Sequence, residues 1–105
     1  MRYEIMKNGI SVDESLEKAI ISKVEKVTER LKRYHPETAH LEVRLGVEEK
    51  HKEYECSLQL KAFREAMHSQ KSSPELRVAV DRSFEALFKE IETYRAKINK
   101  NLAHG

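Results

Sequence analysis

The sequence predicts an α+β fold: a two-layer β-α-β-β-β-α sandwich in which two helices cover one face of a four-stranded sheet. Apolar residues recur every three or four positions in segments 13–34 and 75–100, as on amphipathic helices. Elsewhere they recur every second position, as on strands with one buried face. With 105 residues, three glycines and two prolines, we expect one domain spanning residues 1–105.

The N-terminal part predicts a strand, a turn and a helix. Residues 2–6 suit a short strand, and the Asn-Gly pair at 8–9 signals a turn. Asp13 is a good N-cap for the first helix, although a capping box beginning two residues earlier is an alternative start. We expect this helix to run to about residue 34, because a residue that precedes proline (here Pro36) disfavours helical geometry.

Three further strands are predicted at residues 40–48, 53–63 and 66–71. The polar segment 49–52 closes a hairpin between the first two, and Arg64-Glu65 makes the next turn. The side chains expected to face inward are Leu41, Val43, Leu45, Val47, Tyr54, Cys56, Leu58, Leu60, Ala62, Met67 and Ser69. Cys56 is the single cysteine, and we interpret it as a small buried hydrophobe, a usage that suits a reducing compartment.

The second helix is predicted from Glu75 to about Lys100, with Ser73 as its cap and residues 101–105 fraying. Its apolar stripe comprises Leu76, Val80, Phe84, Leu87, Ile91, Tyr94 and Ile98. Two such stripes supply the cover that the apolar face of the sheet needs, so the opposite sheet face is expected to meet water.

Basic residues on the first helix form a second stripe beside the apolar one. Lys23, Lys26, Arg30 and Arg33 recur at spacings of three and four, and glutamates occupy the other side and the back. The stripe is long enough to meet several phosphates of a nucleic-acid backbone. A solvated helix with Glu–Lys support pairs is the alternative interpretation.

The second helix carries a more diluted set of basic residues. Arg82, Lys89, Lys97 and Lys100 lie on its outer side, and Arg77 and Arg95 lie nearer the core edge. Phe63 is placed either to stack on a base or to pack at a strand end. The candidate RNA-binding residues are Lys23, Lys26, Arg30, Arg33, Arg82, Lys89, Arg95 and Lys97.

Signals for catalysis are poor. No glycine-rich phosphate loop is present, the five histidines lack metal-ligand spacing, and no nucleophile–base arrangement can be placed. We therefore expect no catalytic residues, no metal, no cofactor and no small-molecule substrate. No apolar run suits a signal peptide or a membrane span, so we expect a cytoplasmic protein that does not bind membranes.

The element order and several stretches together resemble the ribosome hibernation promoting factor family. Its members include the ribosome-associated inhibitor A proteins, once called sigma-54 modulation proteins. The resemblance covers about residues 2–100. The stretches that carry it are Tyr3-Glu4-Ile5, Ile10-Ser11-Val12-Asp13-Glu14-Ser15-Leu16, Val24-Glu25-Lys26-Val27, the strand Leu41 to Glu48, and Leu76-Arg77-Val78-Ala79-Val80-Asp81.

The resemblance implies a translation inhibitor that binds the small ribosomal subunit near the decoding centre and blocks the mRNA and tRNA sites under stress. It implies rRNA contacts for Lys23, Lys26, Lys89, Arg95 and Lys97, and a chain of the family's short type. We expect a monomer or weak dimer. Two alternatives remain open: a free module that binds double-stranded RNA, and a protein-interaction domain acting as a homodimer.

Overall fold

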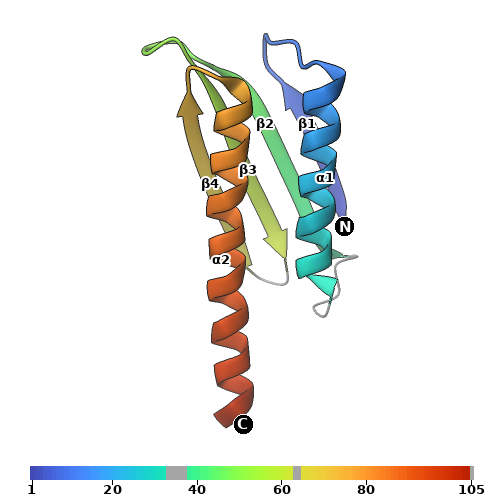
Figure 1. Ribbon diagram of the computed structural model, residues 1–105. Coiled ribbons are helices and arrows are strands. Elements are labelled where there is room, and N and C mark those ends of the chain that lie inside the picture. Colours follow the sequence, from blue (N-terminus) through green and yellow to red (C-terminus); the bar gives the residue numbers. More distant parts are fainter. Residues whose placement is uncertain (33–37, 63–64, 105) are drawn as a thin grey trace.

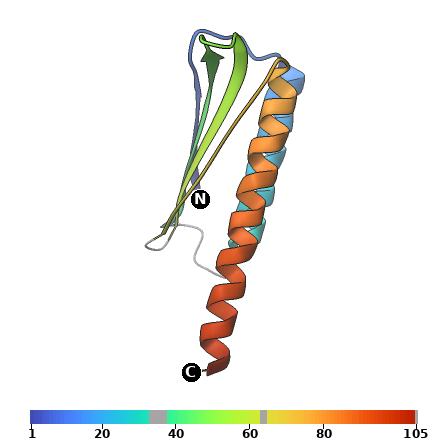
Figure 2. The same cartoon turned by 90° about the vertical axis from the view of Figure 1, so that its left-hand side faces the viewer.

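The computed structural model describes residues 1–32, 38–62 and 65–104, with side chains described up to residue 97. The elements are β1 (Arg2–Lys7), α1 (Glu14–Arg30), β2 (His40–Glu48), β3 (Glu53–Ala62), β4 (Glu65–Ser73) and α2 (Leu76–His104). The strands form one sheet in the order β1-β2-β3-β4, and both helices cover the same face of it (Figures 1 and 2). The predicted two-layer architecture is confirmed.

The sheet is mixed because its first connection is a crossover. β1 pairs with β2 in parallel, and α1 makes the crossover that a parallel pair requires. β2, β3 and β4 are joined as antiparallel neighbours, with Leu45 opposite Cys56 and Val43 opposite Leu58. This register aligns the inward side chains of neighbouring strands in rows beneath the helices.

The core lies between the two layers. Its buried apolar residues include Leu16, Ile20, Val24, Val27, Leu31, Leu41, Val43, Leu45, Leu58, Leu60, Val80, Phe84, Leu87 and Ile91. Two buried serines satisfy their polar groups across it: Ser83 Oγ donates to the Cys56 carbonyl at 2.8 Å, and Ser69 Oγ donates to the Ser83 carbonyl at 2.8 Å. These bonds fix α2 against β3 and β4. Burial raises the pKa of the Cys56 thiol to about 11, in keeping with its predicted interior position.

The helix starts follow the prediction, and the ends differ from it. The Asp13 carboxylate accepts a hydrogen bond from the Leu16 amide at 2.7 Å, which confirms it as the N-cap of α1. α1 ends at Arg30 rather than near residue 34, and the Leu31 amide is shared between the carbonyls of Val27 and Thr28, as in a tightened last turn.

α2 continues to His104, beyond the predicted residue 100, and its C-terminal part extends past the sheet (Figures 1 and 2). The structure therefore places residues 101–104, which were predicted to fray, in helical geometry. Ser73 Oγ accepts a hydrogen bond from the Glu75 amide at 3.2 Å, consistent with the capping role predicted for this serine. The predictions for Arg33, Tyr34, Phe63 and Arg64, and for the side chains of Ile98 and Lys100, lie outside the described residues.

Two predicted inward side chains are not buried. Val47 and Tyr54 lie opposite each other on the helix-facing side of the β2–β3 hairpin, yet they are 46% and 39% exposed. The hairpin end reaches past the first turn of α2, so no helix covers it (Figure 1). Alternation places a side chain on one face of a strand, but burial also requires a covering element.

Candidate nucleic-acid interface

The two helices run side by side in the same direction (Figure 1). Polar side chains on their facing sides contact one another and form what we call the seam. Among the described side chains, three polar contacts join α1 and α2 across this seam. Arg77 Nη2 donates to Ser15 Oγ at 3.2 Å, Lys23 Nζ lies 3.1 Å from Asp81 Oδ1, and Arg30 Nη1 lies 2.5 Å from Glu92 Oε1. Each contact joins a basic side chain to an acceptor on the other helix, so the seam carries charges of both signs.

Arg30 is held from two sides. Its guanidinium carbon lies 4.5 Å from the centre of the Phe88 ring, a cation–π geometry, while Glu92 accepts from its Nη1. Phe88 is half-buried and packs against the core, with its ring centre 6.3 Å from that of Phe84. The side chain of Arg30 therefore rests on an aromatic support that is itself anchored in the core.

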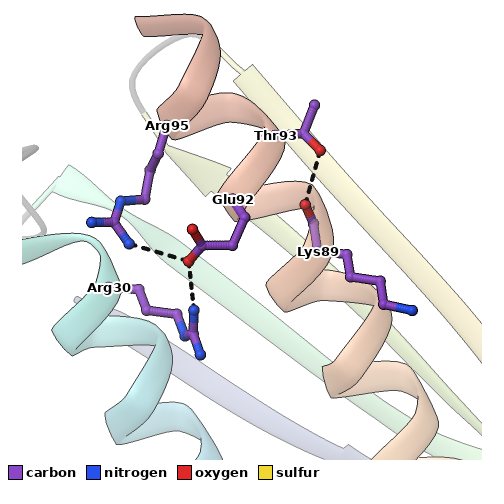
Figure 3. A network of polar contacts seen from close by, with 5 residues as sticks. All are labelled: Arg30, Lys89, Glu92, Thr93 and Arg95. Carbon is purple, nitrogen blue, oxygen red and sulfur yellow. Dashed lines mark hydrogen bonds and ion pairs between the residues drawn. The ribbon is translucent and has the colours of Figure 1, made fainter. Parts of the chain in front are cut away.

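Glu92 connects two arginines through a single oxygen. Its Oε1 accepts from Arg30 Nη1 and from Arg95 Nη1, the latter at 3.1 Å (Figure 3). The Glu92 side chain is 51% exposed, so water reaches this carboxylate. Exposed pairs of this kind contribute about 0–1 kcal/mol each.

The structure divides the predicted basic residues into two groups. The seam group comprises Lys23, Lys26, Arg30 and Arg95, which lie along the side of α1 that faces α2 or reach toward it from α2. The outer group comprises Arg82, Lys89 and Lys97, which are exposed on the other side of α2. Figure 3 shows Lys89 leaving α2 on the side away from Arg30, Glu92 and Arg95.

The two groups differ in how their charges are balanced. Lys23, Arg30 and Arg95 pair with Asp81 or Glu92, whereas Lys26 and the outer group form no ion pair with any other described residue. Lys89 and Lys97 instead line a groove of about 420 Å³ between α2 and β4, beside Met67 and Tyr94. Arg33, the remaining predicted member of the stripe, lies outside the described residues.

Sequence reasoning missed the residues that complete the seam. Asp81, Phe88 and Glu92 were not singled out, although they share one side of α2 with Arg77 and Arg95 at spacings of four, seven, four and three. That periodicity marks a second face of α2, beside its apolar stripe, on which charged and aromatic side chains gather. The contact of this face with α1 joins residues as far as 62 positions apart in the sequence, as in the Arg30–Glu92 pair. It can therefore be identified only from the tertiary structure.

The open face of the sheet has a different character. Alternation places five glutamates on it, from Glu4 on β1 to Glu55 on β3, against Arg2, Arg44 and Lys61. The Glu48 carboxylate accepts the His51 amide, and this bond holds its pKa below the usual value. This acid-rich face is a poor match for a phosphate backbone.

Neither a metal centre nor a membrane span is found where the structure is described. In residues 1–32, 38–62 and 65–104, no three His, Cys, Asp or Glu side chains are grouped so as to hold a metal ion. In the same ranges, no helix is long and apolar enough to cross a membrane.

Two solved structures share this fold. The N-terminal domain of protein Y from Thermus thermophilus superposes with a TM-score of 0.69 at 15% sequence identity, covering 90% of this chain and 99% of that one. A ribosomal subunit interface protein from Coxiella burnetii superposes with a TM-score of 0.70 at 14% identity, covering 91% and 99%. No curated protein matches the chain in sequence.

The family comparison covers nearly the whole chain and agrees with the resemblance seen in the sequence. Residues 3–99 match the model of the family described as sigma 54 modulation protein / S30EA ribosomal protein. That span runs from β1 into the C-terminal half of α2 and includes every described candidate residue. The chain belongs to this ribosome-associated family.

Proposed function

We propose that this protein is a translation inhibitor that binds the small ribosomal subunit through its helix layer and occupies the mRNA and tRNA path near the decoding centre. It acts in the cytoplasm, as a monomer or weak dimer, in stressed cells whose ribosomes are held inactive. It catalyses no reaction; its effect is steric. Membership of a ribosome-associated family supports the partner, and the arrangement of the seam supports the surface.

The observation that carries the proposal is the positioning of Arg30. A guanidinium that lies on Phe88 and is anchored at one nitrogen loses little conformational freedom when it binds a phosphate. Lys26 lies four positions before it on α1, exposed and without an ion pair among the described residues. Together they present one preorganised and one freely available cation on the same helix edge.

The physical mechanism follows from the charge of the seam group and the shape of the fold. Lysine and arginine side chains displace counterions from rRNA phosphates, which makes binding strong and dependent on salt. Phosphate contacts fix orientation without reading base sequence, which suits a partner defined by its folded surface. The two packed layers are then a rigid body that excludes mRNA or tRNA from the space it fills.

Co-sedimentation with purified small subunits across a salt series tests the proposal. We expect saturable binding in dilute buffer, with an affinity that falls linearly on a log–log plot as salt rises. An in vitro translation reaction should slow in proportion to the fraction of subunits bound. No binding at low salt, or binding that ignores salt, would contradict the proposal.

A titration with naked duplex RNA separates this function from that of a general double-stranded RNA binder. We expect the duplex to bind at least ten times more weakly than the small subunit at the same salt. Equal affinity for both would favour the free RNA-binding module. Gel filtration that gives a tight dimer without RNA affinity would favour the protein-interaction domain instead.

A further inference from the structure

A recess lies at the C-terminal end of α1, on the side facing α2. It measures about 530 Å³ and is lined by Glu29, Arg30, Lys32 and Arg95. Among the lining residues that the structure describes, Arg30, Lys32 and Arg95 are cationic, and Glu29 lies 4.0 Å from the Lys32 ammonium. The size suits a phosphate group with its neighbouring sugar, and the lining suits their charge.

Two different contacts hold the cations at this recess. Phe88 supports the face of the Arg30 guanidinium from the core side, whereas Glu92 accepts hydrogen bonds from Arg30 and Arg95. Glu92 is anionic, as a phosphate is, and uses the same N–H donors that a phosphate oxygen would accept from. The aromatic contact positions Arg30, and the carboxylate occupies its donors.

We infer that this recess binds one backbone phosphate of folded RNA, and that Glu92 competes with that phosphate for Arg30 and Arg95. The inference rests on the proposed function and deepens it. It assigns one phosphate subsite to the RNA-binding surface and one residue, Glu92, that weakens phosphate binding at that subsite. Loss of the Glu92 charge leaves Arg30 on Phe88 and weakens the hold of this side chain on one Nη1 group of each arginine. Binding should therefore become tighter, contrary to the usual result of removing a residue from an interface.

The matched pair Glu92→Gln and Glu85→Gln tests the competition. Both lie on α2 and change the net charge equally, and glutamine matches glutamate in helix propensity, but Glu85 is exposed and pairs with no described cation. We expect Glu92→Gln to bind small subunits about three- to fivefold tighter at 0.1 M salt, the range of an exposed ion pair. Its salt slope should steepen by about 0.7–0.9. Glu85→Gln should change affinity less than about twofold, because the Debye length is about 10 Å at that salt.

Glu92→Gln made in an Arg30→Gln background tests whether the gain in affinity acts through Arg30. With Arg30 removed, we expect Glu92→Gln to lose most of its gain, which a general charge effect would retain. Equal gains from the two single variants, or weaker binding by Glu92→Gln, would overturn the inference while leaving ribosome binding itself intact.

Side-chain NMR of the arginine Nε–H groups tests the recess without ribosomes. Adding a ten-nucleotide oligouridylate should shift the Arg30 and Arg95 signals, with saturation at lower concentration in Glu92→Gln than in the unmodified protein. If ribosomes are not bound but these shifts occur, the proposed function fails and the recess stands. If the signals respond to inorganic phosphate and not to the oligonucleotide, the recess takes a free anion and the inference is overturned.

Discussion

The seam group and the outer group contain similar numbers of basic residues, yet they differ in how those residues are held. In the seam group, Lys23, Arg30 and Arg95 are positioned by Asp81, Glu92 and Phe88. In the outer group, Lys89 and Arg82 extend into solvent from the other side of α2 without an ion pair among the described residues. The best-organised cations of this fold are thus also partly neutralised. Their number in the sequence therefore overstates the charge available to a partner.

The largest effect on stability should come from truncation of Phe84, the core residue against which Phe88 packs. Phe84 is a fully buried residue of α2, and Phe84→Ala should lower the free energy of unfolding by about 3–5 kcal/mol. For a chain of this size, that is a fall in melting temperature of more than about 12 °C. Calorimetry measures it, with Glu85→Ala as a surface control expected to stay within about 0.5 kcal/mol. A change of similar size in both variants would contradict the core assignment.

Neutralisation of each group separately tests which one binds. The triple substitution Lys23→Gln, Lys26→Gln, Arg30→Gln should weaken small-subunit binding by about 150-fold or more, since each charged contact contributes about 1 kcal/mol or more. The outer triple Arg82→Gln, Lys89→Gln, Lys97→Gln has the same charge change and should cost less than about fivefold, through long-range attraction alone.

Both triples should melt close to the unmodified protein, because exposed ion pairs contribute about 0–1 kcal/mol each. Their melting curves are therefore the control for the binding result. A greater loss of binding in the outer triple would transfer the interface to the β4 side of α2.

The aromatic support under Arg30 should have a smaller effect. Phe88→Leu keeps an apolar side chain on the core but removes the ring beneath the guanidinium. A cation–π contact at an exposed site contributes about 0.5–1 kcal/mol, so we expect binding to weaken about two- to fivefold. Co-sedimentation measures the change, and unchanged binding would show that Arg30 needs no aromatic support.

The smallest effect is expected for Cys56, whose buried thiol should hardly react with a thiol reagent in the native protein. The thiol is buried, and because burial raises its pKa to about 11, thiolate is scarce below that pH and increases as pH rises toward it. Reaction with a thiol reagent at pH 8 should be far slower in the native state than in denaturant. Neither triple variant should change the native rate, whereas Phe84→Ala should increase it by opening the core more often. Rapid native labelling would place Cys56 at the surface.

Local pattern predicted the parts of this structure that local physics decides. The stripe from Leu16 to Leu31 and the alternation from Leu41 to Leu45 were sufficient for the elements and their buried faces. The position of Tyr54 was missed because its exposure depends on how far α2 reaches over the sheet, which no local pattern contains.

In the candidate site, too, some features follow from local sequence pattern and others only from the tertiary structure. The basic stripe on α1 was visible from its own periodicity, so Lys23, Lys26 and Arg30 could be named as candidates from the sequence. The pairing of Lys23 with Asp81 and of Arg30 with Glu92 depends on how the two helices are aligned, and sequence spacing within one helix gives no information about it. The neutralisation of the seam was consequently invisible before the fold was known.

Site-directed cross-linking tests most directly whether the helix layer faces RNA. Ser22→Cys places one reactive thiol on the exposed edge of α1 beside Lys26, and Gln70→Cys places one on the open face of the sheet, while Cys56 stays unreactive. With a short photo-reactive group on each thiol, the account predicts cross-links to small-subunit rRNA from position 22 and few from position 70. Cross-links to rRNA from position 70 and none from position 22 would contradict it.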